Sequence, residues 1–345
     1  MMRAAVFVQP GNLELATLPE PVPGPGEVVL QVEAAGLCGS DVHAFEGSFP
    51  APFPFVPGHE VVGTIRELGP GVDPGLLHRR AGVHPLLPCS ACDGCAAGRI
   101  NYCRDLSIYG GNLPGGFAER MTVRVSRLLP VPDGLPAEEA AFAEPLACVL
   151  HGLGRIGVER DDRVIIFGAG SIGLLMLQAV RALGAREVHV TDLVPAKLDL
   201  AAGLGGVPCP DPSVAAAPFD LVIDATGNPS VVRTLTTFVR DAGRILLFGV
   251  CPPEATIEFS PFELFRRELT IAGCFSLVDE LEPALALLAD GQVRVTPLVS
   301  ERTGLDGLAT ALGRHGHGGT RSVTCTSRAP RARTAWSISS PIDPA

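Results

Sequence analysis

Residues 163–173 read Arg163-Val-Ile-Ile-Phe167-Gly168-Ala-Gly170-Ser171-Ile172-Gly173, an apolar run that leads into a glycine-rich turn. The apolar run predicts a buried strand over 163–167, and residues 172–183 after the turn have the composition of a helix. Gly168 makes a tight turn, Gly170 lets the backbone approach a pyrophosphate, and Gly173 lets the helix pack closely on the strand. The N-terminus of that helix then faces the negative charge. This stretch predicts a dinucleotide-binding site.

An acidic residue, Asp192, follows the next predicted strand, 187–191. An acid about 20 residues beyond the glycines completes the dinucleotide pattern, because it binds the ribose hydroxyls and repels a 2′-phosphate. We therefore expect NAD and not NADP, although Asp192 could instead cap a helix. Further cofactor contacts are expected at the start of two helices and at the ends of two later strands: Ser171, Ile172, Lys197, Thr226 and Val250.

The remaining segments indicate two domains, since 345 residues exceed one ordinary core. Residues 149–272 alternate apolar strands, at 187–191, 220–224 and 244–248, with helices such as 195–204. This pattern predicts an α/β Rossmann domain, a doubly wound parallel sheet covered on both faces. Residues 1–148 are short apolar runs broken by Gly and Pro, which predicts a β-rich domain.

The C-terminal part is expected to return to the β-rich domain. Residues 273–325 contain two predicted helices, 280–290 and 305–312, and a last strand, 322–325. Residues 326–345 have no periodicity, so we expect a disordered tail.

Charge and hydropathy exclude several classes of partner. The net charge is −10, with no basic run of the kind that a nucleic-acid surface needs. The first 17 residues lack a charged segment followed by an apolar one, which favours a cytoplasmic protein over a secreted one. The uncharged run 164–180 is shorter than the ~20 residues of a membrane span, and it contains the glycine turn.

Four cysteines have the spacing C-x2-C-x2-C-x7-C: Cys89, Cys92, Cys95 and Cys103. Four thiolates hold zinc tetrahedrally at about 2.3 Å, and only closely spaced cysteines on a turning loop converge so tightly. Gly94 permits such a turn. Free or disulfide-paired cysteines are the alternative, but the spacing favours metal. Because four thiolates leave no open position, loop 88–104 predicts a structural zinc site.

Two more motifs of the first domain supply different ligands: Gly36-Leu-Cys38-Gly-Ser40-Asp41-Val-His43 and Pro57-Gly58-His59-Glu60. Each alone is weak, since a cysteine in a glycine-rich turn is usually structural. Together Cys38, His59 and Glu60 offer the thiolate, imidazole and carboxylate of a catalytic zinc with one open position. Glu144 offers a second carboxylate; the alternative interpretation is a helix N-terminal charge that the helix dipole favours. Which glutamate binds the metal stays open.

The order and spacing of these motifs resemble the zinc-containing medium-chain dehydrogenases, and within them the sorbitol (polyol) dehydrogenase branch. The resemblance extends from Arg3 to about Cys325. It implies a GroES-like catalytic domain joined to a Rossmann domain, two zinc ions per chain, NAD, and a homodimer or homotetramer. It also implies that Cys38 and His59 are zinc ligands, and that Glu144 stands where many alcohol dehydrogenases carry a cysteine.

The implied reaction is the oxidation of a secondary hydroxyl of a polyol, sugar alcohol or cyclitol to a ketone. Zinc acts as a Lewis acid that lowers the pKa of the substrate hydroxyl, and the nicotinamide accepts the hydride. Ser40 and His43 would pass the proton outward, since an unperturbed imidazole titrates near neutral pH. A solvent-facing loop histidine is the alternative for His43.

Other functions stay open. L-threonine and simple secondary alcohols are substrates of the same family, although Ser40 and Phe45-Glu46 argue against the threonine branch. A zinc- and nucleotide-binding protein without turnover would have the same fold. Phe45, Phe49 and Phe53 suggest a partly aromatic pocket wall. Residues 78–81 replace the family's usual Gly-Asp-Arg-Val turn, which leaves their local structure in question.

Overall fold

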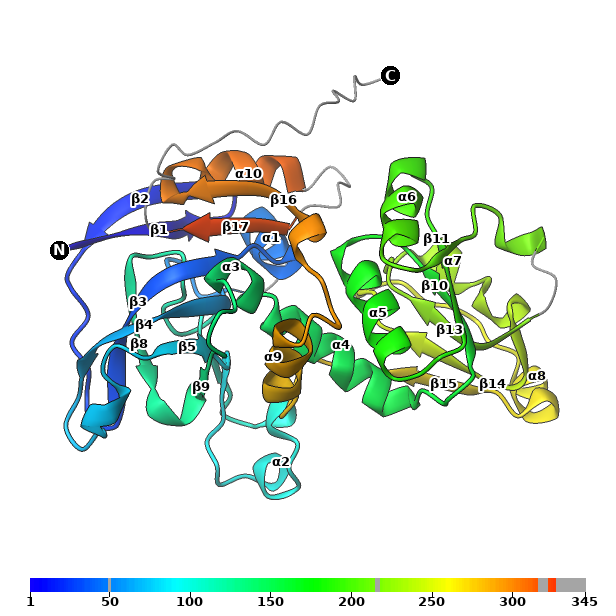
Figure 1. Ribbon diagram of the computed structural model, residues 1–345, viewed down its shortest axis with the longest axis horizontal. Helices are drawn as coiled ribbons and strands as arrows, with labels where there is room; N and C mark the ends of the chain where they lie inside the picture. Colours follow the sequence, from blue (N-terminus) through cyan, green and yellow to red (C-terminus); the bar gives the residue numbers. More distant parts are fainter. Residues whose placement is uncertain (49–50, 215–217, 316–321, 327–345) are drawn as a thin grey trace.

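The computed structural model describes residues 1–48, 51–214, 218–315 and 322–326. Two bodies lie side by side, the catalytic domain on the left of Figure 1 and the nucleotide domain on the right. The chain crosses between them twice. Helix α4 (Ala143–Ile156) leads out, and the segment from β15 (Thr270–Gly273) through α9 (Leu281–Ala289) leads back.

The glycine-rich stretch forms the predicted strand, turn and helix, β10 (Arg163–Phe167) and α5 (Ser171–Ala182). Within the described residues, β10 belongs to a six-stranded parallel sheet of order β12-β11-β10-β13-β14-β15. The order reverses beside β10, so the carboxyl end of β10 is the switch point where such sheets bind ligands. The other elements of this domain are β11 (Glu187–Thr191), α6 (Pro195–Gly203), β12 (Val207–Pro208), β13 (Phe219–Asp224), α7 (Pro229–Val232), β14 (Val239–Leu247) and α8 (Pro261–Arg267).

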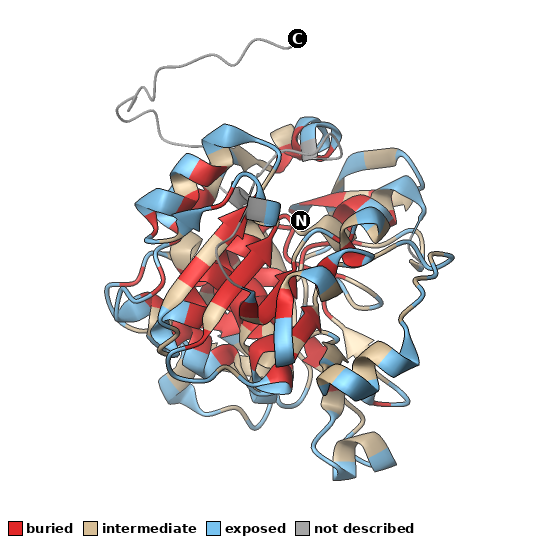
Figure 2. Cartoon of the chain, turned by 90° about the vertical axis from the view of Figure 1, so that its right-hand side faces the viewer, coloured by how far each residue is buried: buried red, intermediate tan, exposed pale blue. Residues whose placement is uncertain are grey.

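Both faces of this sheet are buried, as the uninterrupted apolar strands predict. In β10, Val164 and Ile166 pack into the core shared with α4, α5 and α9, whereas Ile165 and Phe167 pack into a second core on the opposite face. Figure 2 shows the buried strands between exposed helical surfaces. The uncharged run 164–180 is therefore a buried strand, turn and helix, and no helix in the described part of the chain is long and apolar enough to span a membrane.

The catalytic domain is built on a second, mainly antiparallel sheet. Its described strand order is β16-β17-β3-β4-β5-β9, and β8 also pairs with β3. The last described strand, β17 (Ser322–Thr326), lies between β3 and β16, so this C-terminal segment pairs with the first domain. The other elements are β1 (Met2–Gln9), β2 (Asn12–Leu18), β3 (Glu27–Gly36), α1 (Gly39–Glu46), β4 (Glu60–Leu68), β5 (Arg80–Val83), β6 (Leu86–Leu87), α2 (Asp93–Ala96), β7 (Ser107–Ile108), β8 (Arg120–Arg124), β9 (Leu128–Pro130), α3 (Ala137–Ala140), β16 (Val299–Gly304) and α10 (Leu308–His315).

Several expected boundaries shift by a few residues. The expected division at 148/149 falls inside α4, because that helix continues from one domain into the other. The strand expected at 244–248 starts at Val239, and the helix expected at 305–312 begins as a short 3-10 turn before α10. At the unusual turn 78–81, His78 adopts a φ of 68° and β5 then begins at Arg80. Of the expected tail 326–345, Thr326 ends β17 and the rest lies outside the described residues.

Candidate active site

Antiparallel pairing of β3 with β4 brings Cys38, His59 and Glu60 together. Gly36 at the end of β3 pairs with Glu60 at the start of β4, so the residues just beyond these ends meet. One ligand atom from each of Cys38, His59 and Glu60 lies within 4.8 Å of the other two. The structure therefore converges a thiol, an imidazole and a carboxyl group at one point, as the sequence predicts.

Gly36 makes room for the carboxyl group of Glu60. A Cβ atom built on Gly36 would lie 1.8 Å from Glu60 Oε2, closer than any two non-bonded atoms can approach. The side chain of Glu60 thus occupies the space beside the bare backbone of the paired strand. Any larger residue at position 36 would move this carboxylate.

Asp41 holds this cluster in place, a role that the sequence analysis did not assign to it. It is 3% exposed, and its carboxylate accepts hydrogen bonds from the backbone N–H groups of Cys38 (3.0 Å) and Gly58 (3.3 Å). Asp41 Oδ1 also lies 3.7 Å from His59 Nδ1. A carboxylate behind a metal-binding histidine fixes the orientation of the ring. The signal in the sequence is its position three residues after Cys38, in the first turn of α1.

Glu144 lies near the cluster but outside the group of three. It is the second residue of α4 and is 8% exposed, and the Cys148 thiol donates to its Oε1 over 3.6 Å. Burial raises the pKa of Glu144, whereas the charge of His59 acts against that rise. Burial also raises the pKa of Glu60 to about 8, and the charge of Glu144 adds to this rise.

These shifts fit a cation at this point. Burial raises the pKa of Cys38, Glu60 and Glu144, and the charges of neighbouring carboxylates add to each rise, so ionising these groups together is unfavourable. A bound dication reverses this and stabilises the ionised forms. The mixture of sulfur, nitrogen and oxygen donors suits zinc. In this arrangement Cys38, His59 and Glu60 would hold the ion and Glu144 would stand beside it.

The four cysteines of loop 88–104 form the second cluster. Their sulfur atoms all lie within 4.8 Å of one another, with Cys92 to Cys95 at 3.5 Å and Cys89 to Cys95 at 4.0 Å. These separations are far longer than a disulfide bond of about 2.05 Å. The backbone N–H of Arg104 donates to Cys92 Sγ and lowers the pKa of that thiol to about 6. A thiolate at neutral pH and four converging sulfurs fit a closed, structural zinc site.

The three glycines of the nucleotide turn have the geometry that the pattern predicts. Gly168 has a φ of 101°, which favours glycine. A Cβ on Gly173 would lie 1.8 Å from the carbonyl oxygen of Gly168, whereas a Cβ on Gly170 would meet nothing within 4 Å. The helix is therefore packed tightly on the turn, and the backbone at Gly170 is open to a ligand.

Asp192 is tied to this turn and does not cap the next helix. Its carboxylate accepts hydrogen bonds from the N–H groups of Ala169 (2.8 Å) and Val194 (2.9 Å), and Lys197 Nζ lies 3.8 Å away. The residue at the cap position of α6 is Val194. Lys197 thus lies beside Asp192, where its charge partly offsets that of the carboxylate.

The residues expected at the ends of β13 and β14 also meet. A Cβ on Gly227, next to Thr226, would lie 2.4 Å from the carbonyl oxygen of Val250, whose side chain is 86% exposed. Asp224, which the sequence analysis did not single out, is fully buried and organises this turn. Its carboxylate accepts hydrogen bonds from the N–H groups of Thr226 and Gly227 and from Thr226 Oγ1.

Other expected site residues are placed less clearly. His43 is 58% exposed on α1, and its Nδ1 lies 3.3 Å from Ser48 Oγ, while Ser40 is half-buried one turn earlier. The expected aromatic wall is in part core. Phe45 packs on Phe7 with ring centroids 5.3 Å apart, and Phe53 packs on Phe55 at 5.5 Å, whereas Phe49 lies outside the described residues.

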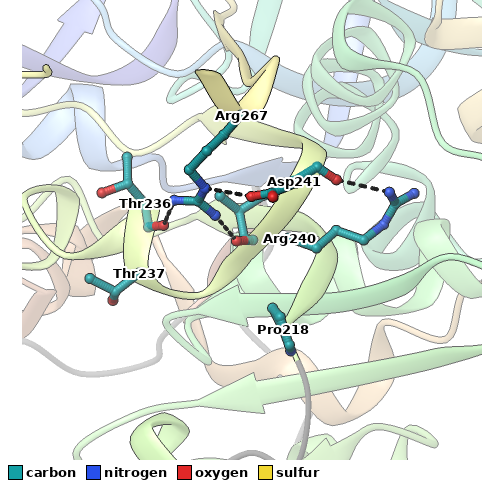
Figure 3. Close-up of a pocket in the computed structure, with 7 residues that line it drawn as sticks. Pro218, Thr236, Thr237, Arg240, Asp241 and Arg267 are labelled. Atoms are coloured by element: carbon teal, nitrogen blue, oxygen red, sulfur yellow. Dashed lines mark hydrogen bonds and ion pairs between the residues drawn. The ribbon is translucent and has the colours of Figure 1, made fainter. Parts of the chain in front are cut away.

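A surface hollow of about 620 Å³ lies at the other end of the nucleotide sheet. Figure 3 shows that Arg267 and Arg240 line it, but both guanidinium groups are already bonded, Arg267 to Asp241 and Arg240 to the Asp241 carbonyl. The hollow borders the start of β14, whereas the nucleotide turn lies at the carboxyl ends of the strands. It is therefore not part of the site.

Known proteins share these features. The alcohol dehydrogenase GroES-like domain model matches residues 24–133, and the zinc-binding dehydrogenase model matches residues 171–290. D-altritol 5-dehydrogenase of Agrobacterium fabrum is 37% identical over 87% of this chain and 92% of its own length. L-galactonate-5-dehydrogenase of Escherichia coli is 31% identical over 87% of this chain and 91% of its own.

The fold is shared as closely. A crystal structure from Sinorhizobium meliloti, described as a zinc-binding dehydrogenase bound to NADP, superposes with a TM-score of 0.90 at 32% identity, covering 94% of this chain and 99% of that one. This chain belongs to the zinc-containing medium-chain dehydrogenases. Like the other members, it is an oxidoreductase with a GroES-like domain and a Rossmann domain. Within the family it belongs to the polyol dehydrogenase-like branch, as the sequence predicts.

Proposed function

We propose that this dehydrogenase oxidises a secondary hydroxyl, flanked by another hydroxyl, in a polyol, sugar alcohol or related sugar acid. The observation that carries the proposal is the donor set, in which the carboxyl group of Glu60 joins the Cys38 thiol and the His59 imidazole, and a second buried carboxyl group, Glu144, stands beside them. Oxygen ligands keep zinc hard and favour further oxygen donors, such as the two hydroxyls of a vicinal diol. The two relatives described above are named as dehydrogenases of position 5 of altritol and galactonate.

In this proposal each residue of the site has a separate role. When bound, zinc supplies Lewis acidity to the substrate hydroxyl and NAD accepts the hydride. Cys38, His59 and Glu60 would hold the metal, and Asp41 keeps His59 oriented. Glu144 would accept hydrogen bonds from the substrate or from water beside the metal. Ser40, in the first turn of α1, would receive the hydroxyl proton, and the exposed His43 would release it to solvent.

The test compares a vicinal diol with its mono-alcohol analogue in the wild type, Glu144→Cys and Glu144→Ala. We expect the wild type to favour the diol in kcat/KM by at least about tenfold, a difference of about 1.4 kcal/mol. Glu144→Cys should narrow this ratio, and Glu144→Ala should mainly lower turnover or zinc occupancy. Equal ratios in all three proteins, or a wild-type preference for primary mono-alcohols or threonine, would contradict the proposal.

We further propose that the chain works as a homodimer or homotetramer in the cytoplasm. Strand β15 is the outermost described strand of the nucleotide sheet, and Phe262 and Phe265 on the neighbouring helix α8 are 64% and 79% exposed. An open strand edge beside exposed aromatic rings suits pairing with a second copy about a twofold axis. The unpaired thiols of the described cysteines suit a reducing compartment. Sedimentation of Phe265→Glu and of the wild type tests this interface. If the interface is correct, the variant should dissociate into monomers at a higher protein concentration than the wild type does.

A further inference from the structure

The two crossover connections between the domains are in direct contact. Helix α4 begins at the zinc-ligand cluster, where it carries Glu144, and ends against the nucleotide sheet. The return segment starts at Gly273 of β15 and reaches α9, which packs along α4. Figure 1 shows α4 and α9 side by side between the two domains. The relative position of the domains therefore depends on how these two connections are joined.

A hydrogen bond between two side chains joins them. His151 Nδ1, on α4, lies 2.8 Å from Glu280 Oε1, at the start of α9, and the two side chains are 14% and 24% exposed. The other oxygen of Glu280 accepts hydrogen bonds from the N–H groups of Val278 (2.6 Å) and Asp279 (3.0 Å). The carboxylate thus orders the end of the return segment and binds it to α4 at the same time.

The catalytic domain is fastened to the same segment through His84. The Nε2 atom of His84 lies 2.8 Å from the carbonyl oxygen of Val278, and its Nδ1 accepts a hydrogen bond from Leu86 N–H. Because Nδ1 accepts, the proton is on Nε2 and the ring donates to Val278. A second bond runs in parallel, from the Asn101 side-chain amide to the Phe275 carbonyl at 2.8 Å.

The packing around this chain of bonds leaves little freedom for sliding. A Cβ on Gly152, one residue after His151, would lie 2.9 Å from Phe248 and 3.1 Å from Cys274 Sγ. The backbone of α4 is therefore in close contact with the end of the nucleotide sheet. The hydrogen bonds from His84 to Val278 and between Glu280 and His151 then connect this end of the sheet to the catalytic domain.

We propose that His151 and Glu280 are positioning residues for hydride transfer, because their bond sets how the nucleotide domain meets the zinc-ligand cluster. The hydride must pass from a substrate held on one domain to a nicotinamide held on the other, and a misplacement of 1 Å costs up to about a hundredfold in rate. Neither residue contacts the metal ligands or the nucleotide turn among the described contacts. The inference depends on family membership and not on the polyol proposal.

The test measures single-turnover NADH formation, with protiated and deuterated forms of whichever alcohol the wild type oxidises best. The variants are His151→Leu, Glu280→Ala, the double variant and the conservative Glu280→Gln. Glu187→Gln is the matched control, since the Glu187–Arg163 ion pair of 2.9 Å lies within the nucleotide domain alone. NADH affinity, zinc content and thermal unfolding are measured for each protein.

We expect His151→Leu and Glu280→Ala each to slow hydride transfer by at least about tenfold, with NADH affinity and zinc content within about twofold of wild type. The double variant should be no slower than the slower single variant, because both remove the same bond. Glu280→Gln should recover most of the rate, and Glu187→Gln should keep it. An unchanged rate, an additive double variant, or a loss explained by weaker NADH binding or partial unfolding would overturn the proposal. A wild type that oxidises only mono-alcohols would remove the polyol function but leave this test intact.

Discussion

Glu60 and Gly36 are a matched pair across two strands, and the site depends on both. Gly36→Ala would place a methyl carbon only 1.8 Å from the present position of Glu60 Oε2, so the carboxylate would have to move. We expect this variant to fold but to lose catalytic-site zinc and at least about tenfold in kcat/KM, since a ligand would move by more than its bonding tolerance. Metal analysis with the steady-state assay is the measurement. Gly82→Ala is the control, because a Cβ there meets nothing within 4 Å, and a normal zinc content in Gly36→Ala would refute the argument.

We expect a single carboxylate, that of Asp192, to set the preference of the enzyme for NAD over NADP. It lies beside the nucleotide turn, where it would accept the ribose hydroxyls and repel a 2′-phosphate. We expect the wild type to use NAD at least about a hundredfold better than NADP in kcat/KM, and Asp192→Ala to reduce this ratio by about tenfold or more. Lys197 lies close enough to attract a phosphate once the aspartate is removed. A wild type that uses both cofactors equally would show that Lys197 already offsets the carboxylate.

At the scale of elements, we expect the stability of loop 88–104 to depend on a bound metal ion. Its helix α2 has only four residues and buries none of them, so apolar packing contributes little to its stability. We expect Cys95→Ser to lower the Tm by about 5 °C or more, given ~2–4 °C per kcal/mol for domains of this size and the large contribution of structural zinc to folding. Turnover per folded molecule should change less than about threefold, and Cys209→Ser, outside both clusters, is the control. A variant that keeps its Tm but loses turnover would place the zinc of this loop in the reaction.

Sequence patterns predict elements whose cause is local. The strand and turn at 163–173 and the four-cysteine spacing were predictable because each is decided within about twenty residues. The convergence of Cys38, His59 and Glu60 was also predictable as a set of donors. The roles of Asp41 and Asp224 were not, because each carboxylate is defined by N–H groups that only the folded turns present to it. The His151–Glu280 hydrogen bond could not be predicted from the sequence either, because 129 residues separate its partners and only the folded chain brings them together.

At the scale of the whole molecule, acid should loosen the contact between the domains through His84. Burial lowers the pKa of His84 from its ordinary value of 6.5, and Arg127 lowers it further, whereas the bond to Val278 and the charges of Asp279 and Glu280 act against the shift. Below pH 6.5 the imidazole is therefore protonated more readily in the unfolded chain than in the folded one. The free energy of unfolding should then fall as the pH drops through this value, by at most about 1.4 kcal/mol per pH unit for one group.

The measurement is the urea midpoint at pH 7.5 and near pH 5.5. His84→Gln keeps a donor for the Val278 carbonyl but does not titrate, so the difference between the two midpoints should become smaller. His43→Gln, at an exposed position, should leave the difference unchanged. An identical difference in wild type and His84→Gln would exclude His84 as the source of the acid sensitivity.

The position of β17 has a consequence for how the protein is made. Its backbone fills the gap between β16 and β3, and Thr324 pairs with Gly36, the residue beside Glu60. Residues near position 40 are translated early, but the sheet that supports them stays incomplete until the chain has been translated almost to its end. The nucleotide domain is continuous in sequence, so it can fold during translation, before the C-terminal residues have been synthesised. Messages cut short before residue 322 would therefore yield a chain able to bind nucleotide but unable to use it.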